Sequence, residues 1–289
     1  MSLIIGSAQF GLDYGISNKR GLVEANEVKK IINLAEANDI QEIDTAVNYG
    51  SSQDVIGSVK SKIKVSSKLP AINLKTNKIE KKLIEIIIET LKSLDRSNLK
   101  TLYLHDPSQL FETGGSEIYE HLQTFKLDGL IERIGVSVYN PEDLERLIKH
   151  FDFDTVQVPY NVIDRRFDSD ALLSRLKQKN IEINCRSIFL QGLLLIPFLD
   201  IPKQFMKWKD IFLRWGNWLD ENSIHPVHAC IAGAKQNDFI DNIVIGVESA
   251  NQLEQVINFY KMCENRTMQF PQITSFDTYL VNPSHWSSK

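Results

Sequence analysis

Four residues in the N-terminal part of the chain have side chains that together can deliver a proton to a carbonyl oxygen. They are Asp44, Tyr49, Lys68 and His105. A free phenol, with a pKa of about 10, holds its proton tightly, but a nearby ammonium favours the phenolate, and a carboxylate can orient that ammonium. An imidazole can donate a hydrogen bond to the same carbonyl oxygen. Because carbonyl reduction needs a hydride on carbon and a proton on oxygen, the set predicts a general-acid site for that chemistry.

These residues lie at or just after the ends of short apolar runs, which alternate with longer segments of helical periodicity. Such alternation is typical of βα units around a parallel sheet. The eight candidate strands are residues 3–5, 42–44, 63–67, 101–104, 134–137, 155–158, 181–186 and 243–245. When parallel strands close into a barrel, their carboxyl ends meet at one rim, where the four side chains would converge. We therefore predict a (β/α)8 TIM barrel.

The segments between the strands carry apolar residues at three- and four-residue spacing, which predicts helices. These helices are expected at residues 24–37, 78–94, 116–128, 141–149 and 170–179. The gap before the last strand is too long for one βα unit, and residues 204–221 are typical of an extra amphipathic helix near the rim. After Glu264 the chain becomes polar and contains prolines, so we expect a tail over the barrel. No linker divides the chain, which predicts a single domain over residues 1–289.

Composition excludes several classes of function. The 289 residues carry a formal net charge of −4, so we expect no nucleic acid partner. The N-terminus lacks a secretory signal, and the most apolar stretch is interrupted by polar residues and a proline, so we expect a cytoplasmic protein without a membrane segment. The three cysteines have no disulfide or zinc-ligand spacing, so buried free thiols and no metal are expected. We expect a monomer or a weak homo-oligomer.

The segment DTAVNYGSSQDVIG, residues 44–57, resembles the aldo-keto reductases, and VSSKLP and LYLHDP place Lys68 and His105 where that family has its lysine and histidine. Further matches are GLIERIGVS, VQVPYN, RSIFLQGLL and IVIGVES, and the resemblance runs from Gly6 to about Val256. It implies reduction of an aldehyde or ketone, with Tyr49 as general acid and Lys68 lowering its pKa. Asp44 would anchor Lys68, and His105 would orient the substrate carbonyl.

The resemblance also implies a reduced nicotinamide cofactor, NAD(P)H, bound without a Rossmann domain, and no GxGxxG motif follows an early strand. Ser137 and Gln157 match the residues that hold the nicotinamide carboxamide, whereas Val138 stands where the family has an asparagine. The full set expected at the cofactor is Gly6, Ser7, Ala8, Asp44, Ser137, Gln157, Arg186, Ser187, Phe189, Gln191, Gly192, Gly246, Glu248 and Gln252.

Two further positions depart from the family pattern. Arg186 replaces the aromatic ring that usually stacks on the nicotinamide. It could stack there and disfavour the oxidised cofactor, or it could face a substrate acid or pair with a carboxylate. Glu248 stands near the place of a basic residue that grips the 2'-phosphate of NADPH, and a carboxylate favours a ribose hydroxyl instead. This gives a slight preference for NADH, although the family's general use of NADPH keeps both cofactors open.

The loop after the first strand, GSAQFGLDYGISN, is expected to reach the substrate opening. Phe10, Asp13, Tyr14 and Asn161 are the candidate substrate contacts, and this polar rim would suit a hydroxylated or sugar-like carbonyl compound. Two alternatives remain. One is a nicotinamide-binding regulatory module with little turnover. The other is a Schiff-base aldolase that uses Lys68, although an adjacent Asp44 would hold that ammonium charged.

Overall fold

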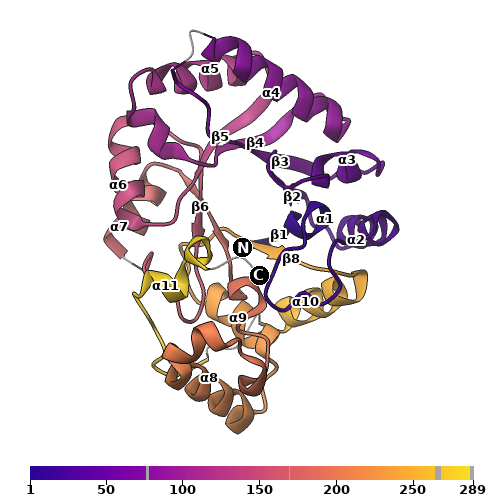
Figure 1. Ribbon diagram of the computed structural model, residues 1–289, viewed down its shortest axis with the longest axis vertical. Helices are drawn as coiled ribbons and strands as arrows, with labels where there is room; N and C mark the ends of the chain where they lie inside the picture. Colours follow the sequence, from indigo (N-terminus) through magenta and orange to yellow (C-terminus); the bar gives the residue numbers. More distant parts are fainter. Residues whose placement is uncertain (76–77, 169, 264–267, 287–289) are drawn as a thin grey trace.

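The computed structural model describes residues 1–75, 78–168, 170–263 and 268–286, and its centre is a closed barrel of eight parallel strands (Figure 1). The strands pair in chain order, and β8 closes the ring against β1. They are β1 (Ser2–Gly6), β2 (Glu42–Asp44), β3 (Lys64–Leu69), β4 (Leu99–Leu104), β5 (Ile131–Ser137), β6 (Thr155–Pro159), β7 (Glu182–Arg186) and β8 (Asn242–Gly246). The predicted (β/α)8 barrel is confirmed.

Helices surround the barrel on its outside (Figure 1). They are α1 (Ala8–Gly11), α2 (Ala25–Ala37), α3 (Ser52–Gly57), α4 (Ile79–Leu94), α5 (Gly115–Leu127), α6 (Pro141–His150), α7 (Asp170–Gln178), α8 (Lys209–Asn222), α9 (Pro226–Lys235), α10 (Ala250–Met262) and α11 (Thr278–Val281). The 3-10 turns are η1 (Pro107–Phe111), η2 (Leu190–Gly192), η3 (Phe198–Asp200), η4 (Lys203–Trp208) and η6 (Pro283–His285).

The expected helix at residues 204–221 is wrong in one respect, because the segment is two elements. It begins as the 3-10 turn η4 after Pro202 and becomes the α-helix α8 at Lys209. Phe205, Phe212 and Trp215 are buried in a second apolar cluster beside the barrel. Together, η4 and α8 form the extra helical region that we expected before the last strand.

The chain after residue 267 packs against the same cluster. Ile273, Leu280 and Val281 are each at most 1% exposed and belong to it. Asp277 caps α11 and also accepts hydrogen bonds from Lys207 and Trp208. The described part of the tail is therefore held on the barrel, as expected.

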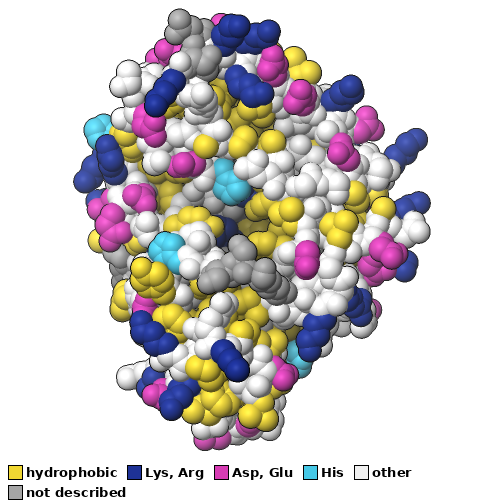
Figure 2. All heavy atoms as spheres, viewed as in Figure 1, with side chains coloured by type: hydrophobic (Ala, Val, Ile, Leu, Met, Phe, Trp, Pro, Cys, Tyr) yellow, Lys and Arg dark blue, Asp and Glu magenta, His cyan; other side chains and the backbone are white. Residues whose placement is uncertain are grey.

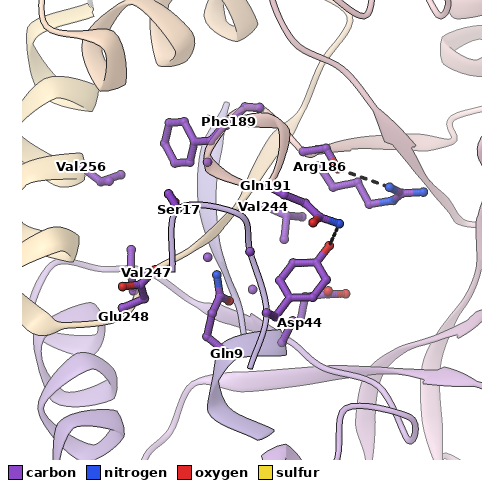
Figure 3. Close-up of a pocket in the computed structure, with 18 of the residues that line it drawn as sticks. Gln9, Ser17, Asp44, Arg186, Phe189, Gln191, Val244, Val247, Glu248 and Val256 are labelled. Carbon is purple, nitrogen blue, oxygen red and sulfur yellow. Dashed lines mark hydrogen bonds between the residues drawn. The ribbon is translucent and has the colours of Figure 1, made fainter. Parts of the chain in front are cut away.

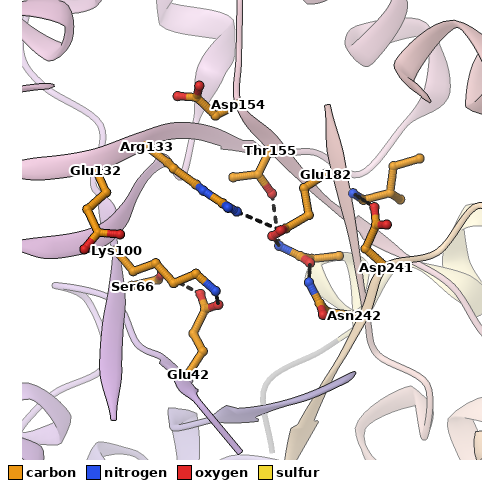
Figure 4. Close-up of polar contacts among 12 residues, drawn as sticks. Glu42, Ser66, Lys100, Glu132, Arg133, Asp154, Thr155, Glu182, Asp241 and Asn242 are labelled. Atoms are coloured by element: carbon orange, nitrogen blue, oxygen red, sulfur yellow. Dashed lines mark hydrogen bonds and ion pairs between the residues drawn. The ribbon is translucent and has the colours of Figure 1, made fainter. Parts of the chain in front are cut away.

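The amino-terminal end of the barrel is closed by polar side chains (Figure 4). Glu42 pairs with Lys100 and accepts a hydrogen bond from Ser66. Asn184 donates to Tyr103 at 2.9 Å, and both residues are almost completely buried. Burial raises the pKa of Glu42, while Lys100 opposes the shift. This closed end leaves the carboxyl-terminal rim as the open side of the barrel.

Charged side chains gather around the circumference formed by the outer helices, whereas the centre of the face in Figure 2 is hollowed. Cys185, Cys230 and Cys263 are free and buried. None of the described helices combines the length and the apolar character needed to cross a bilayer.

Candidate active site

One cavity of about 240 Å³ lies at the carboxyl-terminal rim, and Asp44, Tyr49, Lys68 and His105 all line it (Figure 3). Asp44 ends β2, and it pairs in register with Ser66 of β3. Side chains alternate between the two faces of a strand, so Lys68, two residues after Ser66, points into the barrel on the same side. Parallel pairing of the strands therefore brings the carboxylate and the ammonium together.

Lys68 and Asp44 form a buried ion pair. Nζ of Lys68 lies 2.5 Å from Oδ2 of Asp44 and donates a second hydrogen bond to the carbonyl of Thr45 at 3.0 Å. The other carboxylate oxygen of Asp44 accepts a 3.0 Å hydrogen bond from Nε2 of Gln157. Lys68 is 1% exposed, so burial lowers its pKa while Asp44 opposes the shift.

Tyr49 and His105 lie above this ion pair. Nζ of Lys68 is 5.1 Å from the centre of the Tyr49 ring, and the rings of Tyr49 and His105 meet edge to face at 6.3 Å. Burial and the charge of Asp44 raise the pKa of Tyr49, and Arg186 opposes them. We expected Lys68 to lower the pKa of this phenol; the net direction is upward because burial and Asp44 outweigh the single opposing cation, Arg186. Tyr49 therefore holds its proton at neutral pH.

His105 is neutral in the same range. Burial, together with the charges of Lys68 and Arg186, lowers its pKa from 6.5 to about 4. A neutral imidazole carries one N–H donor, so it can donate a hydrogen bond without bringing a second positive charge into the cavity.

The position of Tyr49 depends on close packing between α1 and the turn before α3. A Cβ atom on Gly11 would lie 1.7 Å from the carbonyl oxygen of Tyr49. Gly50 has a φ of +54°, and a Cβ there would lie 2.2 Å from the carbonyl oxygen of Gly11. Ser52 then joins the two segments through hydrogen bonds to Ser7. Two glycines therefore allow the backbone contact that sets the height of the phenol in the cavity.

Ser137 and Gln157 supply polar atoms deeper in the cavity. Ser137 ends β5, and Gln157 lies near the end of the adjacent strand β6, where the two residues are paired in register. Oγ of Ser137 is 3.5 Å from Oε1 of Gln157. Both are nearly completely buried. Val138 contributes a backbone carbonyl that accepts a 3.2 Å hydrogen bond from Arg186. A primary amide, which both donates and accepts hydrogen bonds, matches the side chains of Ser137 and Gln157.

The opposite end of the cavity is formed by the start of α10. Ser249 caps this helix by accepting a hydrogen bond from the amide of Gln252. The amide of Ala250 donates to Oε1 of Glu27 at 2.9 Å, and the amide of Glu248 donates to the side chain of Gln252. A carboxylate of the chain therefore already binds one of the amides at this helix end, and Glu248 lies beside it.

The sequence as a whole matches the model of the Aldo/keto reductase family over residues 2–278. The chain belongs to the aldo/keto reductase family. Membership implies an NAD(P)-dependent oxidoreductase and, in general, reduction of carbonyl compounds with NAD(P)H.

Solved structures of aldo-keto reductases share the fold. The holo form of AKR11C1 from Bacillus halodurans superposes with a TM-score of 0.70 at 15% identity, covering 93% of this chain and 88% of the other. PA4992, a proposed aldo-keto reductase from Pseudomonas aeruginosa, gives 0.68 at 18% identity, covering 91% and 90%. The search of curated protein sequences finds no match.

In this aldo-keto reductase the cavity gathers most of the residues expected at the cofactor. Those that line it are Gly6, Ala8, Asp44, Ser137, Gln157, Arg186, Ser187, Phe189, Gln191, Gly192, Gly246, Glu248 and Gln252. Ser7 does not, because its buried side chain bonds to Ser52. Tyr14 lines the cavity and accepts a 3.1 Å hydrogen bond from Gln191.

Three of the expected substrate contacts lie outside the cavity. Phe10 is 0% exposed and packs in the barrel core. Asn161 is 1% exposed, and its side chain accepts hydrogen bonds from Ile163 and Asp164 and donates one to Ser187. Asp13 is exposed and is absent from the cavity lining. The expectation that these residues contact substrate is corrected. Phe10 packs in the core, Asn161 orders the loop after β6 and joins it to Ser187, and Asp13 is exposed outside the lining.

Sequence reasoning missed several residues of the lining. Gln9, Ser17, Tyr139 and Gln255 border the cavity. Gln9 packs against Gly246, where a Cβ would lie 2.6 Å from its amide nitrogen. A signal existed for Tyr139, which follows the strand-ending Ser137 by two residues. Gln255 lies three residues after Gln252 on α10. Residues at this spacing share a helix face, so the prediction of Gln252 could have included Gln255.

Proposed function

We propose that this protein reduces an aldehyde or ketone to an alcohol with NAD(P)H, and that Tyr49 is the general acid. The observation that carries the proposal is the single cavity shared by Tyr49, His105 and the Asp44–Lys68 pair with the side chains of Ser137 and Gln157. A proton donor and a polar pocket for a carboxamide are thereby side by side. When bound, the nicotinamide cofactor supplies the hydride.

The proton moves from the hydroxyl of Tyr49 to the carbonyl oxygen of the substrate. The raised pKa keeps this hydroxyl protonated until charge develops on that oxygen. The phenolate that remains is stabilised by Lys68, whose Nζ lies against the ring, and by the charge of Arg186. Neutral His105 donates a hydrogen bond to the same oxygen and fixes its direction.

Asp44 and Gln157 keep the ammonium in place. Asp44 holds Lys68 from one side and receives a hydrogen bond from Gln157 on the other. In the proposed complex, Ser137 and Gln157 hold the carboxamide. The valine at position 138 cannot replace the family's asparagine, and loss of one neutral hydrogen bond costs about 0.5–1.5 kcal/mol of binding.

The start of α10 supports a preference for NADH. Helix N-termini attract anions. Here the amide of Ala250 is bonded to Glu27, and Glu248 brings a second carboxylate. A 2'-phosphate would meet two negative charges, whereas a ribose hydroxyl can donate a hydrogen bond to Glu248.

Steady-state oxidation of NADH and NADPH with simple aldehydes tests the proposal. Tyr49→Phe is expected to lower kcat by about 10²- to 10⁴-fold. Tyr279→Phe, at an exposed tyrosine outside the cavity, is the matched control. Cofactor binding, followed by fluorescence, should persist in both variants. Equal turnover by Tyr49→Phe and the wild type would exclude the phenol as the proton donor.

A further inference from the structure

Among the described residues that line the cavity, Arg186 is the cationic side chain without an acidic ion-pair partner. It ends β7, and its guanidinium extends to the side of the cavity opposite Glu248 and Val256 (Figure 3). It donates hydrogen bonds to the carbonyl of Val138 at 3.2 Å and to the hydroxyl of Ser187 at 3.4 Å. Among residues 1–75, 78–168, 170–263 and 268–286, no carboxylate forms an ion pair with it.

The other basic groups of the cavity carry no unbalanced charge, and the carboxylate of Glu248 lies on the opposite side from Arg186 (Figure 3). Lys68 is neutralised by Asp44 at 2.5 Å, and burial keeps His105 neutral. Arg186 therefore contributes one positive charge that the neighbouring groups do not balance. Its field reaches the reacting groups, since it acts electrostatically on Tyr49, Lys68 and His105.

The guanidinium is held in a fixed orientation. Its central carbon lies 4.2 Å from the centre of the Tyr139 ring, which covers one face. A guanidinium has five N–H donors. The hydrogen bonds to Val138 and Ser187 use two of them, so three have no acceptor within the described part of the chain. A planar group with free donors along its edge is suited to bidentate binding of a carboxylate or a phosphate.

A neutral substrate in the cavity would displace water from this charge without balancing it, whereas an anionic substrate would balance it. The phenol of Tyr139 already stacks against the guanidinium, and the hydroxyl of Tyr14 accepts its hydrogen bond from Gln191 instead. Neither tyrosine replaces an anion.

We propose that the carbonyl substrate carries an oxyanion group, a carboxylate or a phosphate, and that Arg186 binds it while Tyr49 protonates the carbonyl oxygen. The inference rests on the proposed function and names its substrate class.

Two pairs of substrates that differ in charge separate the two sources of the oxyanion. Succinic semialdehyde is compared with butanal, and glyceraldehyde 3-phosphate with glyceraldehyde, each at saturating NADH. The measured quantity is the ratio of kcat/KM for the anionic member to that for the neutral member. Because both members are assayed on the same enzyme with the same cofactor, the ratio cancels changes in folding or in cofactor binding.

In the wild type we expect at least one ratio above about 10. Arg186→Gln should lower that ratio by about 10- to 100-fold. Arg186→Lys, which keeps the charge but cannot donate two parallel hydrogen bonds, should lower it less. Arg175→Gln is the matched control, since Arg175 pairs with Glu145 on the surface and lies outside the cavity. It should leave the ratio unchanged.

A wild-type ratio near 1 for both pairs, or an equal ratio in Arg186→Gln, would overturn the inference and leave the proposed reductase intact. Equal loss with both members of a pair, accompanied by weaker NADH binding, would assign Arg186 to the cofactor. If no carbonyl compound is reduced, the proposed function fails. The substrate class is then decided by titrating succinic semialdehyde against wild type and Arg186→Gln, with weaker binding to the variant expected.

Discussion

The side-chain amide of Gln157 donates a 3.0 Å hydrogen bond to Asp44, although the two residues are 113 positions apart in the chain. Asp44 also holds Lys68, so the residue proposed to bind the carboxamide touches the same carboxylate that positions the ammonium. In the proposed mechanism, binding of the cofactor and proton transfer would therefore both depend on the carboxylate of Asp44. The effect of this shared carboxylate on the stability of the fold can be measured.

Removal of the ammonium should destabilise the fold more than removal of the whole ion pair. Lys68→Met leaves the Asp44 carboxylate buried without its cation, which costs about 3–5 kcal/mol. In the double variant Asp44→Asn with Lys68→Met, neither charge of this pair is left, and the asparagine oxygen can still accept a hydrogen bond from Gln157. Urea denaturation should show the double variant to be more stable than Lys68→Met. The opposite order would mean that the pair is not buried in solution.

His105 should make the stability depend on pH below neutrality. Its pKa is lowered from 6.5 to about 4 on folding, so the unfolded chain binds this proton first. The contribution of His105 to the free energy of unfolding is therefore fully present above pH 6.5. It is lost as the pH falls towards 4, by up to about 1.4 kcal/mol per pH unit. Denaturation of wild type and His105→Gln at several pH values measures the effect. The wild-type curve should be the steeper one, and parallel curves would contradict the assignment.

Cofactor preference should follow the carboxylates at the start of α10. Glu248→Arg is expected to shift the ratio of kcat/KM from NADH towards NADPH by about tenfold or more, since the phosphate gains a charge-assisted hydrogen bond. Adding Glu27→Gln should extend the shift. Glu254→Arg, an exposed position on the same helix outside the cavity, is the control for net charge. A wild type that already favours NADPH tenfold would disprove the preference for NADH.

Gly11→Ala should impair both folding and turnover. The new Cβ would lie 1.7 Å from the backbone of Tyr49, so α1 or the phenol must move. The matched substitution Gly216→Ala, in α8, meets no atom within 4 Å. It should be neutral or stabilise the helix by up to about 1 kcal/mol. Thermal unfolding and kcat of the two variants decide whether the Gly11 contact sets the site.

The barrel could be predicted because its strands are short apolar runs that lie between amphipathic segments in the sequence. Helix α9 was not expected, and its composition explains why: PVHACIAGAK is apolar around most of its circumference, and eight of its residues, Val227 to Ala234, are buried. Such a helix has no polar face, so the periodic signal that revealed α4 is weak. Helix α10 is also absent from the predicted helices, although Ser249 is an ordinary N-cap signal.

Some residues of the candidate site could be predicted from the sequence, and others could not. Residues at strand ends, such as Asp44 and Ser137, could be located because the strand register carries them to the rim. Residues of the predicted loop after β1 could not, because part of that segment folds as the short helix α1, which buries Phe10 in the core. The bond from Ala250 to Glu27 joins positions 223 apart, and no local pattern records it.

Closure of β8 against β1 extends over five registered residue pairs, from Ser2 with Asn242 to Gly6 with Gly246. The two walls that carry Gly6 and Gly246 therefore come from strands that lie far apart in the sequence and are synthesised at different times. A chain that stops before β8 lacks one side of the pocket and leaves an edge of β1 unpaired, so the pocket can form only after β8 has been synthesised.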